Sequence, residues 1–419
     1  MSEFKKISVV GLGYIGLPTA AMFASRKVEV IGVDINEHAV ETINRGDVHI
    51  AEPDLDIVVH ACVHEGYLRA TSIPEPAEAF MIAVPTPFEG GNHEPDLRYI
   101  EAASKAIAPV LSAGNLVVLE STSPIGTTEA MADWLAEARP DLSFPQHAGE
   151  DSDIRIAHCP ERVLPGQVMK ELIANDRVIG GMTKRCSDLA IKLYGTFVTG
   201  ECVIASGPRV AEMAKLTENS FRDVNIAFAN ELSIICDHLD MDVWELIRLA
   251  NRHPRVNILQ PGPGVGGHCI AVDPWFIVSS APEHARLIRT AREVNDEKPN
   301  WVVEKVNAEI GRFLMHHPEK TAADVRLAIY GLAFKPNIDD LRESPALEIS
   351  FSLANEHPGQ IMVVEPNIEV LPDALNVAKL VTADIASKAD IHVMLVDHRG
   401  FHSIERPDGA LIDARGVWV

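Results

Sequence analysis

The chain has 419 residues, of which 47% are hydrophobic and 23% charged, and its formal net charge is −23 at pH 7. This length predicts two or three domains, and the composition is that of an ordinary globular protein. The negative charge disfavours nucleic acid or an anionic membrane surface as the main partner. An anionic small substrate would need a local basic pocket.

The six cysteines are scattered, without the spacing of a metal site or a disulfide framework. They are Cys62, Cys159, Cys186, Cys202, Cys236 and Cys269. In a large chain this pattern indicates reduced thiols. The first residues lead directly into a strand pattern rather than a signal peptide, and no apolar run has membrane-spanning length. We therefore expect a cytoplasmic protein without a metal site.

The first 34 residues carry the order of elements that binds a dinucleotide. An apolar strand over 7–10 precedes a GxGxxG motif over 11–16, and a helix is expected over 17–26. A second strand over 28–33 ends in Asp34. A glycine motif between a strand and a helix, followed by an acidic residue after the next strand, is strong evidence for a Rossmann domain.

Each glycine of the motif has its own physical role. Gly11 permits a tight turn, Gly13 lets a pyrophosphate approach the backbone, and Gly16 lets the helix pack closely on the strand. Asp34 can accept a hydrogen bond from the ribose 2′-hydroxyl and would repel a 2′-phosphate. The pattern therefore predicts NAD rather than NADP as the cofactor.

Polar residues follow three further strands of this domain. Strands are expected over 79–84 and 116–120, and Thr86 and Thr122 lie in the loops after them. Because ligands bind at the carboxyl ends of strands in such sheets, both hydroxyls are candidate site residues, although either could equally form a turn or cap a helix. Glu161 also follows a strand, and the alternative for it is an ordinary solvated carboxylate.

A long helix is expected over 208–239, with apolar residues on several of its faces. Such a helix often joins two domains and can form a dimer interface. Lys215 and Asn219 are four residues apart and share one face, where their donors could stabilise an oxyanion. The alternative is a solvated lysine near Glu218.

A glycine-rich stretch over 262–274 ends in a thiol and a carboxylate. Four glycines in six residues let backbone N–H groups approach an anion such as a diphosphate. We expect Cys269 to be a nucleophile. The alternatives are an inert buried cysteine and an Asp273 that merely caps a helix beginning at Pro274. Arg252, His253 and Arg255, just before the loop, supply the local positive charge that an anionic substrate requires.

The last third repeats the pattern of the first domain in degenerate form. Strands are expected over 325–330 and 361–364, and Glu365-Pro366-Asn367 after the second of them parallels Asp34-Ile35-Asn36. Lys335 stands where the glycine motif is lost, and a lysine suits a phosphate. Further strands are expected over 391–396 and 410–413.

The predicted fold is therefore α/β, with two Rossmann-like doubly wound domains joined by a helical central domain. The expected bounds are 1–200 for the NAD-binding domain, 201–315 for the helical domain with the cysteine loop, and 316–419 for a domain that binds a second nucleotide-like ligand.

These motifs resemble those of the UDP-glucose/GDP-mannose dehydrogenase family over essentially the whole chain. In chain order they are Gly11-x-Gly13-Tyr14-Ile15-Gly16, Val84-Pro85-Thr86-Pro87, Glu120-Ser121-Thr122, Pro160-Glu161, Ala211-Glu212-x-x-Lys215-x-x-x-Asn219, Gly264-Val265-Gly266-Gly267-His268-Cys269 and Phe334-Lys335-x-x-x-Asp339-Asp340-x-Arg342-Glu343-Ser344-Pro345. Residues 251–257 and 266–274 look like the branch that oxidises UDP-N-acetyl-hexosamines, so UDP-N-acetyl-D-mannosamine is the expected substrate.

The resemblance implies a four-electron oxidation of the sugar C6 to a carboxylate, with two NAD⁺ consumed. Cys269 would capture the aldehyde as a thiohemiacetal, and a thioester would follow and be hydrolysed. Lys215 and Asn219 would stabilise the oxyanions. Asp273 would act as a base or position water, and Glu161 and Thr122 would assist proton transfer.

The resemblance also implies the binding residues. NAD would be held by Gly11, Gly13, Tyr14, Ile15, Gly16, Asp34, Pro85, Thr86 and Thr122 and, from the third domain, by Arg342. The UDP-sugar would be held by Glu161, Arg162, Val163, Leu164, Lys215, Asn219, Arg252, His253, Arg255, Gly266, Phe334 and Lys335. Arg255 would reach the site of a neighbouring subunit, which implies a homodimer, and the product would enter a cell-surface polysaccharide.

Three alternatives stay open at this point. The sugar could be UDP-N-acetyl-D-glucosamine, because the sequence does not fix the C2 configuration. The chain could be a two-electron β-hydroxyacid dehydrogenase, which would not need Cys269, or a regulator that binds NAD or a UDP-sugar without catalysis. Pro165 stands where UDP-glucose dehydrogenases often place a second glutamate, and it argues against UDP-glucose.

Overall fold

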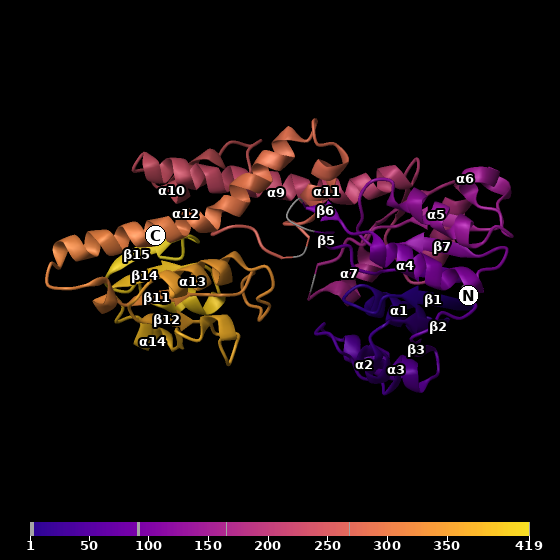
Figure 1. The fold of residues 1–419 in the computed structure, drawn as a ribbon, viewed down its shortest axis with the longest axis horizontal. Coiled ribbons are helices and arrows are strands. Elements are labelled where there is room, and N and C mark those ends of the chain that lie inside the picture. The colour runs from indigo at the N-terminus through magenta and orange to yellow at the C-terminus, as the bar shows by residue number, and fades with distance from the viewer. Residues whose placement is uncertain (1–3, 90–92, 165, 268, 419) are drawn as a thin grey trace. The chain divides into compact units, whose positions relative to one another are not determined.

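The computed structural model describes residues 4–89, 93–164, 166–267 and 269–418, so Pro165 and His268 lie outside the described residues. The chain forms two compact units, residues up to 218 with 279–281 and residues 219–278 with 282–419 (Figure 1). The three predicted domains are finer than these two units, and their bounds stay a prediction.

The first unit contains an eight-stranded sheet in the order β10-β9-β8-β7-β4-β1-β2-β3. Neighbouring strands are parallel except β8 and β9, which are antiparallel. The strands are β1 Lys6–Val10, β2 Glu29–Val33, β3 Leu68–Thr71, β4 Ala79–Ile82, β7 Leu116–Leu119, β8 Arg155–His158, β9 Arg177–Gly181 and β10 Cys202–Ile204. A separate antiparallel pair is formed by β5 Phe88–Glu89 and β6 Glu94–Pro95.

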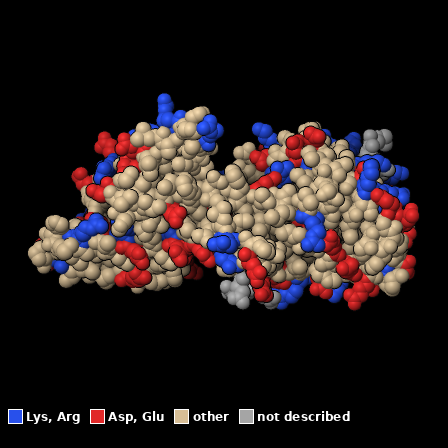
Figure 2. Space-filling model, turned by 90° about the horizontal axis from the view of Figure 1, so that it is seen from above, with Lys and Arg blue, Asp and Glu red and all other residues tan. Residues whose placement is uncertain are grey.

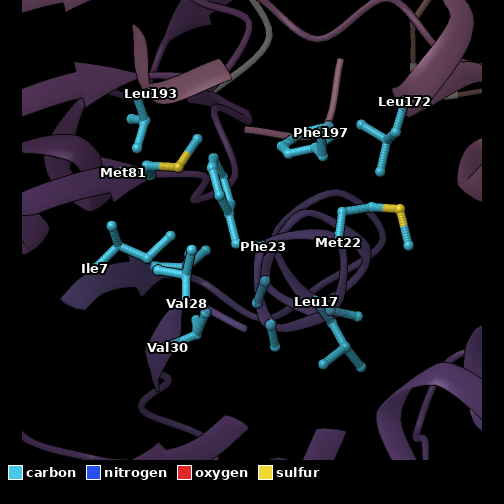
Figure 3. Packing of buried hydrophobic residues seen from close by; sticks show 14 of the residues in the cluster. Ile7, Leu17, Met22, Phe23, Val28, Val30, Met81, Leu172, Leu193 and Phe197 are labelled. Carbon is cyan, nitrogen blue, oxygen red and sulfur yellow. The ribbon is translucent and has the colours of Figure 1, made fainter. Parts of the chain in front are cut away.

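Helices pack on both faces of this sheet, as a doubly wound fold requires. They are α1 Gly16–Ser25, α2 Glu37–Asn44, α3 Leu55–His64, α4 Arg98–Ile107, α5 Thr127–Ala138, α6 Pro145–Ala148, α7 Val168–Ala174 and α8 Lys184–Tyr194. Figure 3 shows the core on the α1 face, where Phe23 lies among Ile7, Met81, Leu193 and Phe197. The rings of Phe23 and Phe197 meet edge to face with centroids 4.7 Å apart.

The second unit contains a five-stranded parallel sheet in the order β13-β12-β11-β14-β15. Its strands are β11 Leu327–Tyr330, β12 Ile361–Val364, β13 Lys379–Leu380, β14 Ile391–Met394 and β15 Ala410–Asp413, and its helices include α13 Pro345–Glu356 and α14 Ala383–Ala386. The order matches that of β3-β2-β1-β4-β7 in the first sheet. The predicted fold class, two Rossmann-like domains with a helical region between them, is confirmed.

Two helices of 31 residues each supply most of the helical region, α9 Pro208–His238 and α12 Arg286–His316. The shorter helices α10 Val243–Ala250 and α11 Asp273–Ser280 lie between them in the sequence. Helix α12 contacts α13, β14 and β15 and so covers one face of the second sheet (Figure 1).

Within the described ranges, no helix is both long and apolar enough to cross a membrane. Figure 2 shows acidic and basic side chains interspersed on the face that it draws, without a broad basic field.

The two sheets repeat one arrangement of a glycine turn and a carboxylate. The N–H of Leu12 donates to Asp34 Oδ2, and the N–H of Leu332 donates to Glu365 Oε2, both at 2.8 Å. The preceding residues, Gly11 and Gly331, both have a φ of 89°. The third domain is thus a second copy of the first arrangement, as the sequence predicts.

The two carboxylates differ in their surroundings. Asp34 is partly exposed, whereas Glu365 is buried and also accepts a hydrogen bond from His398 Nε2 at 3.0 Å. Burial raises the pKa of Glu365, but hydrogen bonds from His398 and from the backbone of Leu332 and Asn367 outweigh it and lower the pKa to about 2. Glu365 is therefore an internal anchor of the turn and not a ribose ligand.

We predict that Glu365→Gln lowers the free energy of unfolding at pH 7 by about 1–3 kcal/mol, because charged hydrogen bonds are lost in a buried place. Because the pKa of Glu365 is lowered in the folded state, its stabilising effect is complete at pH values above 4.5, the ordinary carboxyl pKa. It is lost as the pH falls from 4.5 through about 2. The difference in free energy of unfolding between wild type and Glu365→Gln, measured in urea, should therefore shrink as the pH falls over this range. The exposed Glu369→Gln serves as the control, and equal midpoints for the two variants at pH 7 would refute the prediction.

Candidate active site

The glycine turn after β1 has the geometry that a bound pyrophosphate requires. A Cβ on Gly11 would lie 2.6 Å from the Ala83 carbonyl oxygen, and a Cβ on Gly16 would lie 1.7 Å from the Gly11 oxygen. Side chains are therefore excluded at both positions. A Cβ on Gly13 would meet nothing within 4 Å, so the backbone there is open to a ligand.

Polar groups gather at the carboxyl edge of β1, β2, β4 and β7, which are adjacent parallel strands. The Thr86 hydroxyl is buried without a hydrogen-bond partner among the described residues. Because buried polar groups are usually paired, this hydroxyl is a candidate for a hydrogen bond with a bound ligand. Ser121 Oγ donates to the Val84 carbonyl at 2.7 Å and ties the two neighbouring loops together. Tyr14, Ile15, Pro85 and Thr122 are all partly or fully exposed. These residues fit NAD.

Glu161 follows β8 and is only 8% exposed, so its alternative as a solvated carboxylate is wrong. Burial raises its pKa to about 7, and the nearby charges of Lys215 and Arg177 reduce this rise. Its Oε1 has no hydrogen-bond partner within the described ranges. A carboxyl group that titrates near neutral pH is suited to acid–base catalysis.

The start of helix α9, which belongs to the first unit, is held there by Glu212, a residue that sequence reasoning missed as functional. The Glu212 carboxylate accepts hydrogen bonds from the N–H groups of Gly126 and Thr128 at 2.6 and 2.8 Å, and from the Thr128 hydroxyl at 2.6 Å. These groups lie at the start of α5, so Glu212 caps that helix. One turn further along α9 stands Lys215.

Lys215 is only 8% exposed, and its alternative as a solvated lysine near Glu218 is wrong. Glu218 instead forms an ion pair with Arg162, with 2.6 Å between Nη2 and Oε1. The positive charge of Lys215 acts on the Glu161 carboxyl group and partly offsets the rise in its pKa that burial causes. The structure thus brings an ammonium group and a carboxyl group of the predicted site together.

The rest of the loop after Glu161 is held by the first unit. The N–H of Leu164 donates to Glu171 Oε2 at 2.7 Å, and Val163 is half-buried. The guanidinium of Arg162 is occupied by Glu218 and the Asp176 carbonyl. Their roles in substrate binding stay predictions.

In the second unit, Asn219 and Asp273 form a direct pair. Asn219 Nδ2 donates to Asp273 Oδ2 at 2.5 Å, and both side chains are buried. Asp273 is the first residue of α11, and its N–H donates to the Cys269 carbonyl at 2.9 Å. Cys269 is exposed, so its alternative as an inert buried cysteine is wrong.

The glycine loop packs on the third domain. A Cβ on Gly266 would lie 2.3 Å from the Glu343 carbonyl oxygen, and one on Gly267 would lie 3.1 Å from the Phe334 ring. The N–H of Gly267 donates to that same carbonyl at 3.4 Å. Glu343 has a φ of +50°, a costly conformation for a residue with a side chain. Lys335, next to Phe334, is exposed.

The remaining basic residues of the predicted site are exposed. Arg252, His253 and Arg255 lie in the loop after α10, where the N–H of Arg255 donates to His253 Nδ1 at 3.3 Å. Arg342 is exposed and pairs with Asp340, with 2.6 Å between Nη2 and Oδ2. Their contacts with substrate or cofactor stay predictions.

Three family models match the chain in succession. They describe the NAD binding domain of the UDP-glucose/GDP-mannose dehydrogenase family at residues 5–198, its central domain at 209–297 and its UDP binding domain at 328–418. The chain belongs to this family. It is an NAD-dependent oxidoreductase, with NAD as its cofactor and a UDP-sugar as its substrate.

Relatives match along the full length. The chain is 64% identical to a UDP-N-acetyl-D-mannosamine dehydrogenase of Yersinia pestis, over 99% of this chain and 100% of the relative. It is 62% identical to an NDP-N-acetyl-D-galactosaminuronic acid dehydrogenase of Ralstonia nicotianae, over 99% and 97%. A solved UDP-D-ManNAc dehydrogenase from Pyrococcus horikoshii is 37% identical with a TM-score of 0.84, over 99% of this chain and 96% of that one.

We predict that turnover of this dehydrogenase rises with pH through about 7, because the carboxylate form of Glu161 can accept a proton and its pKa is raised to about 7. Glu161→Gln should lower kcat and remove this limb from the pH profile. Glu101→Gln, on the surface of α4, is the matched control and should keep both. An unchanged profile in Glu161→Gln would rule out this role.

Proposed function

We propose that the chain oxidises C6 of UDP-N-acetyl-D-mannosamine to the carboxylate and consumes two NAD⁺ for each sugar. The observation that carries this proposal is the exposed thiol of Cys269, which follows a glycine loop packed on the UDP-binding domain. The alternative reading as a two-electron β-hydroxyacid dehydrogenase has no use for such a thiol. The name of the Yersinia relative supports the choice of sugar.

The covalent steps take place on Cys269. NAD⁺, when bound, supplies the hydride acceptor for each of the two oxidations. The thiolate adds to the C6 aldehyde and forms a C–S bond, which prevents loss of the aldehyde between the oxidations. After the second oxidation the thioester is attacked by water, the C–S bond breaks, and the carboxylate and the thiolate separate with release of protons.

The neighbouring polar residues support these steps. Lys215 and Asn219 lie four residues apart on one face of α9, and both are buried. Their N–H donors would stabilise the negative oxygen of each tetrahedral intermediate, where a dry setting strengthens hydrogen bonds. Asp273, paired with Asn219, and Glu161 would move protons to and from water, with Thr122 assisting.

We further infer that the enzyme works as a homodimer. Phe221, Phe228 and Ile235 stand seven residues apart on α9 and are 69%, 51% and 44% exposed. Spacing of seven residues places them on one face of the helix. An exposed apolar row of this kind is typical of a surface that a second copy covers.

The product of the proposed reaction, a nucleotide-linked hexosaminuronate, would be a building block for a cell-surface polysaccharide.

We predict two NADH per sugar and no released aldehyde when the purified chain turns over UDP-N-acetyl-D-mannosamine. A panel with UDP-N-acetyl-D-glucosamine and UDP-glucose identifies the sugar. Cys269→Ala should lower acid formation by at least about 10³-fold, as loss of a nucleophile does. Its NAD⁺ and UDP-sugar binding, measured by calorimetry, should stay nearly intact.

Cys202→Ala, at the other cysteine that is not fully buried, is the matched control. One NADH per sugar with a carbonyl product would support the two-electron alternative. Tight binding without turnover on any UDP-hexosamine would support the regulator. Wild-type acid yield from Cys269→Ala would exclude the covalent route.

We predict that Arg255 acts on the partner's substrate, so that Arg255→Ala raises KM without unfolding the chain. Mixed dimers that carry Arg255→Ala in one subunit and Cys269→Ala in the other can be purified with two tags. They should keep the wild-type KM and about half of the wild-type kcat, because one of their two sites is complete. Mixed dimers with the raised KM of Arg255→Ala would show that Arg255 serves its own subunit.

A further inference from the structure

One buried face of α9 carries more polar residues than the proposed chemistry uses. Glu212, Lys215, Asn219, Asp223 and Asn230 follow at intervals of three, four, four and seven residues, and all five are buried. These intervals place them on one face of the helix. Asp223 and Asn230, both fully buried, have no role in the reaction described above.

Asp223 and Asn230 belong to a continuous hydrogen-bonded chain that ends on the glycine loop. Asp223 Oδ1 accepts from Asn295 Nδ2 at 2.8 Å, and Asn295 Oδ1 accepts from Asn230 Nδ2 at 2.8 Å. Asn230 Oδ1 in turn accepts from the N–H of Gly262 at 2.8 Å. We call Asp223, Asn295 and Asn230 the Gly262 tether. Arg292 anchors its far end, because Arg292 Nη1 donates to Asp223 Oδ1 at 2.6 Å.

The same helix holds the other end of the loop through Asn219, which donates to Asp273. Asn219 and Asn230 are eleven residues apart, which is about 16 Å along a helix and close to three full turns. The loop from Gly262 to Asp273 could reach more than twice that distance if extended. Its two ends are therefore set by one rigid helix and not by the loop itself.

Burying the polar side chains of the Gly262 tether costs free energy of folding. Asp223 Oδ2 and Arg292 Nε are buried without hydrogen-bond partners among the described residues. Buried ion pairs of this kind are often no more stabilising than apolar side chains of the same volume. Apolar side chains, however, could not accept a hydrogen bond from the N–H of Gly262. We therefore take the role of the tether to be the placement of the Gly262 backbone rather than the stabilisation of the core.

We propose that Asn230 and Asn295 are positioning residues for the reaction, which hold the Gly262 end of the loop so that Cys269 and the glycines keep their places. This inference rests on the proposed function. Neither residue touches the reacting atoms. Both act through the backbone of the loop, and a small displacement of a nucleophile is enough to slow a reaction about 100-fold.

The test compares Asn295→Ala with Asn307→Ala. Both positions are on α12, and Asn307 is exposed and bonds only to Glu356 among the described contacts. We expect Asn295→Ala to lower kcat by about 10- to 100-fold and to leave KM for NAD⁺ within twofold. Hydrogen exchange of the peptide spanning 262–273 should become at least tenfold faster, whereas peptides from β11 and β14 should not change.

Two outcomes would overturn the proposal. One is kcat and loop exchange within twofold of wild type in Asn295→Ala. The other is equally faster exchange throughout the second unit, which would reveal a general role in stability. If Asn295→Ala does not fold, Asn295→Ser replaces it, since serine keeps a small polar side chain without a new charge but cannot reach both Asp223 and Asn230. It should show the same local change at smaller size.

The exchange measurement needs no substrate. Absence of turnover in the wild-type chain would therefore count against the proposed function alone, and faster exchange confined to the loop would still support the Gly262 tether.

Discussion

A buried polar group is costly unless it is paired, and along α9 most of the buried polar side chains are paired with segments distant in the sequence. Glu212 can be buried because it caps α5, and Asn219 can be buried because it meets Asp273. Asn230 is satisfied by Gly262. Each pairing fixes a segment far away in the sequence, so the polar face of one helix determines where the loops of the site begin and end.

The two sheets show how one turn serves two purposes. In the first, Asp34 holds the glycine turn and is still partly exposed, so its carboxylate can also face a ribose. In the second, Glu365 holds the equivalent turn but is enclosed with His398. In the second sheet the carboxylate still accepts the hydrogen bond from the glycine turn, but it is buried and cannot also bind a ribose. In our proposal, the glycine loop and the loop that carries Lys335 recognise the UDP-sugar in that domain instead.

The sequence was sufficient wherever the signal was local. The strands, the glycine turn and the long helix α9 follow from periodicity and from residues a few positions apart, and the structure has them close to their predicted bounds. The sequence was insufficient to predict which polar side chains are buried. A solvated Lys215 near Glu218 was a reasonable alternative, but Glu218 pairs with Arg162, which lies 56 residues away in the sequence. The pairing of Asp223 with Asn295 spans 72 residues. Spacing can place polar residues on one face, but it cannot show what covers that face.

The exposure of Cys269 has a chemical cost. Burial raises the pKa of Cys62 to about 11 and that of Cys159 to about 12, so these thiols are poorly reactive. Cys269 stands in solvent, where peroxide converts a reactive thiolate to a sulfenic acid and then to irreversible products. Oxidative damage to this enzyme should therefore concentrate on the residue that we propose as its nucleophile. If Cys269 is the nucleophile, its oxidation removes turnover without removing any buried contact of the core.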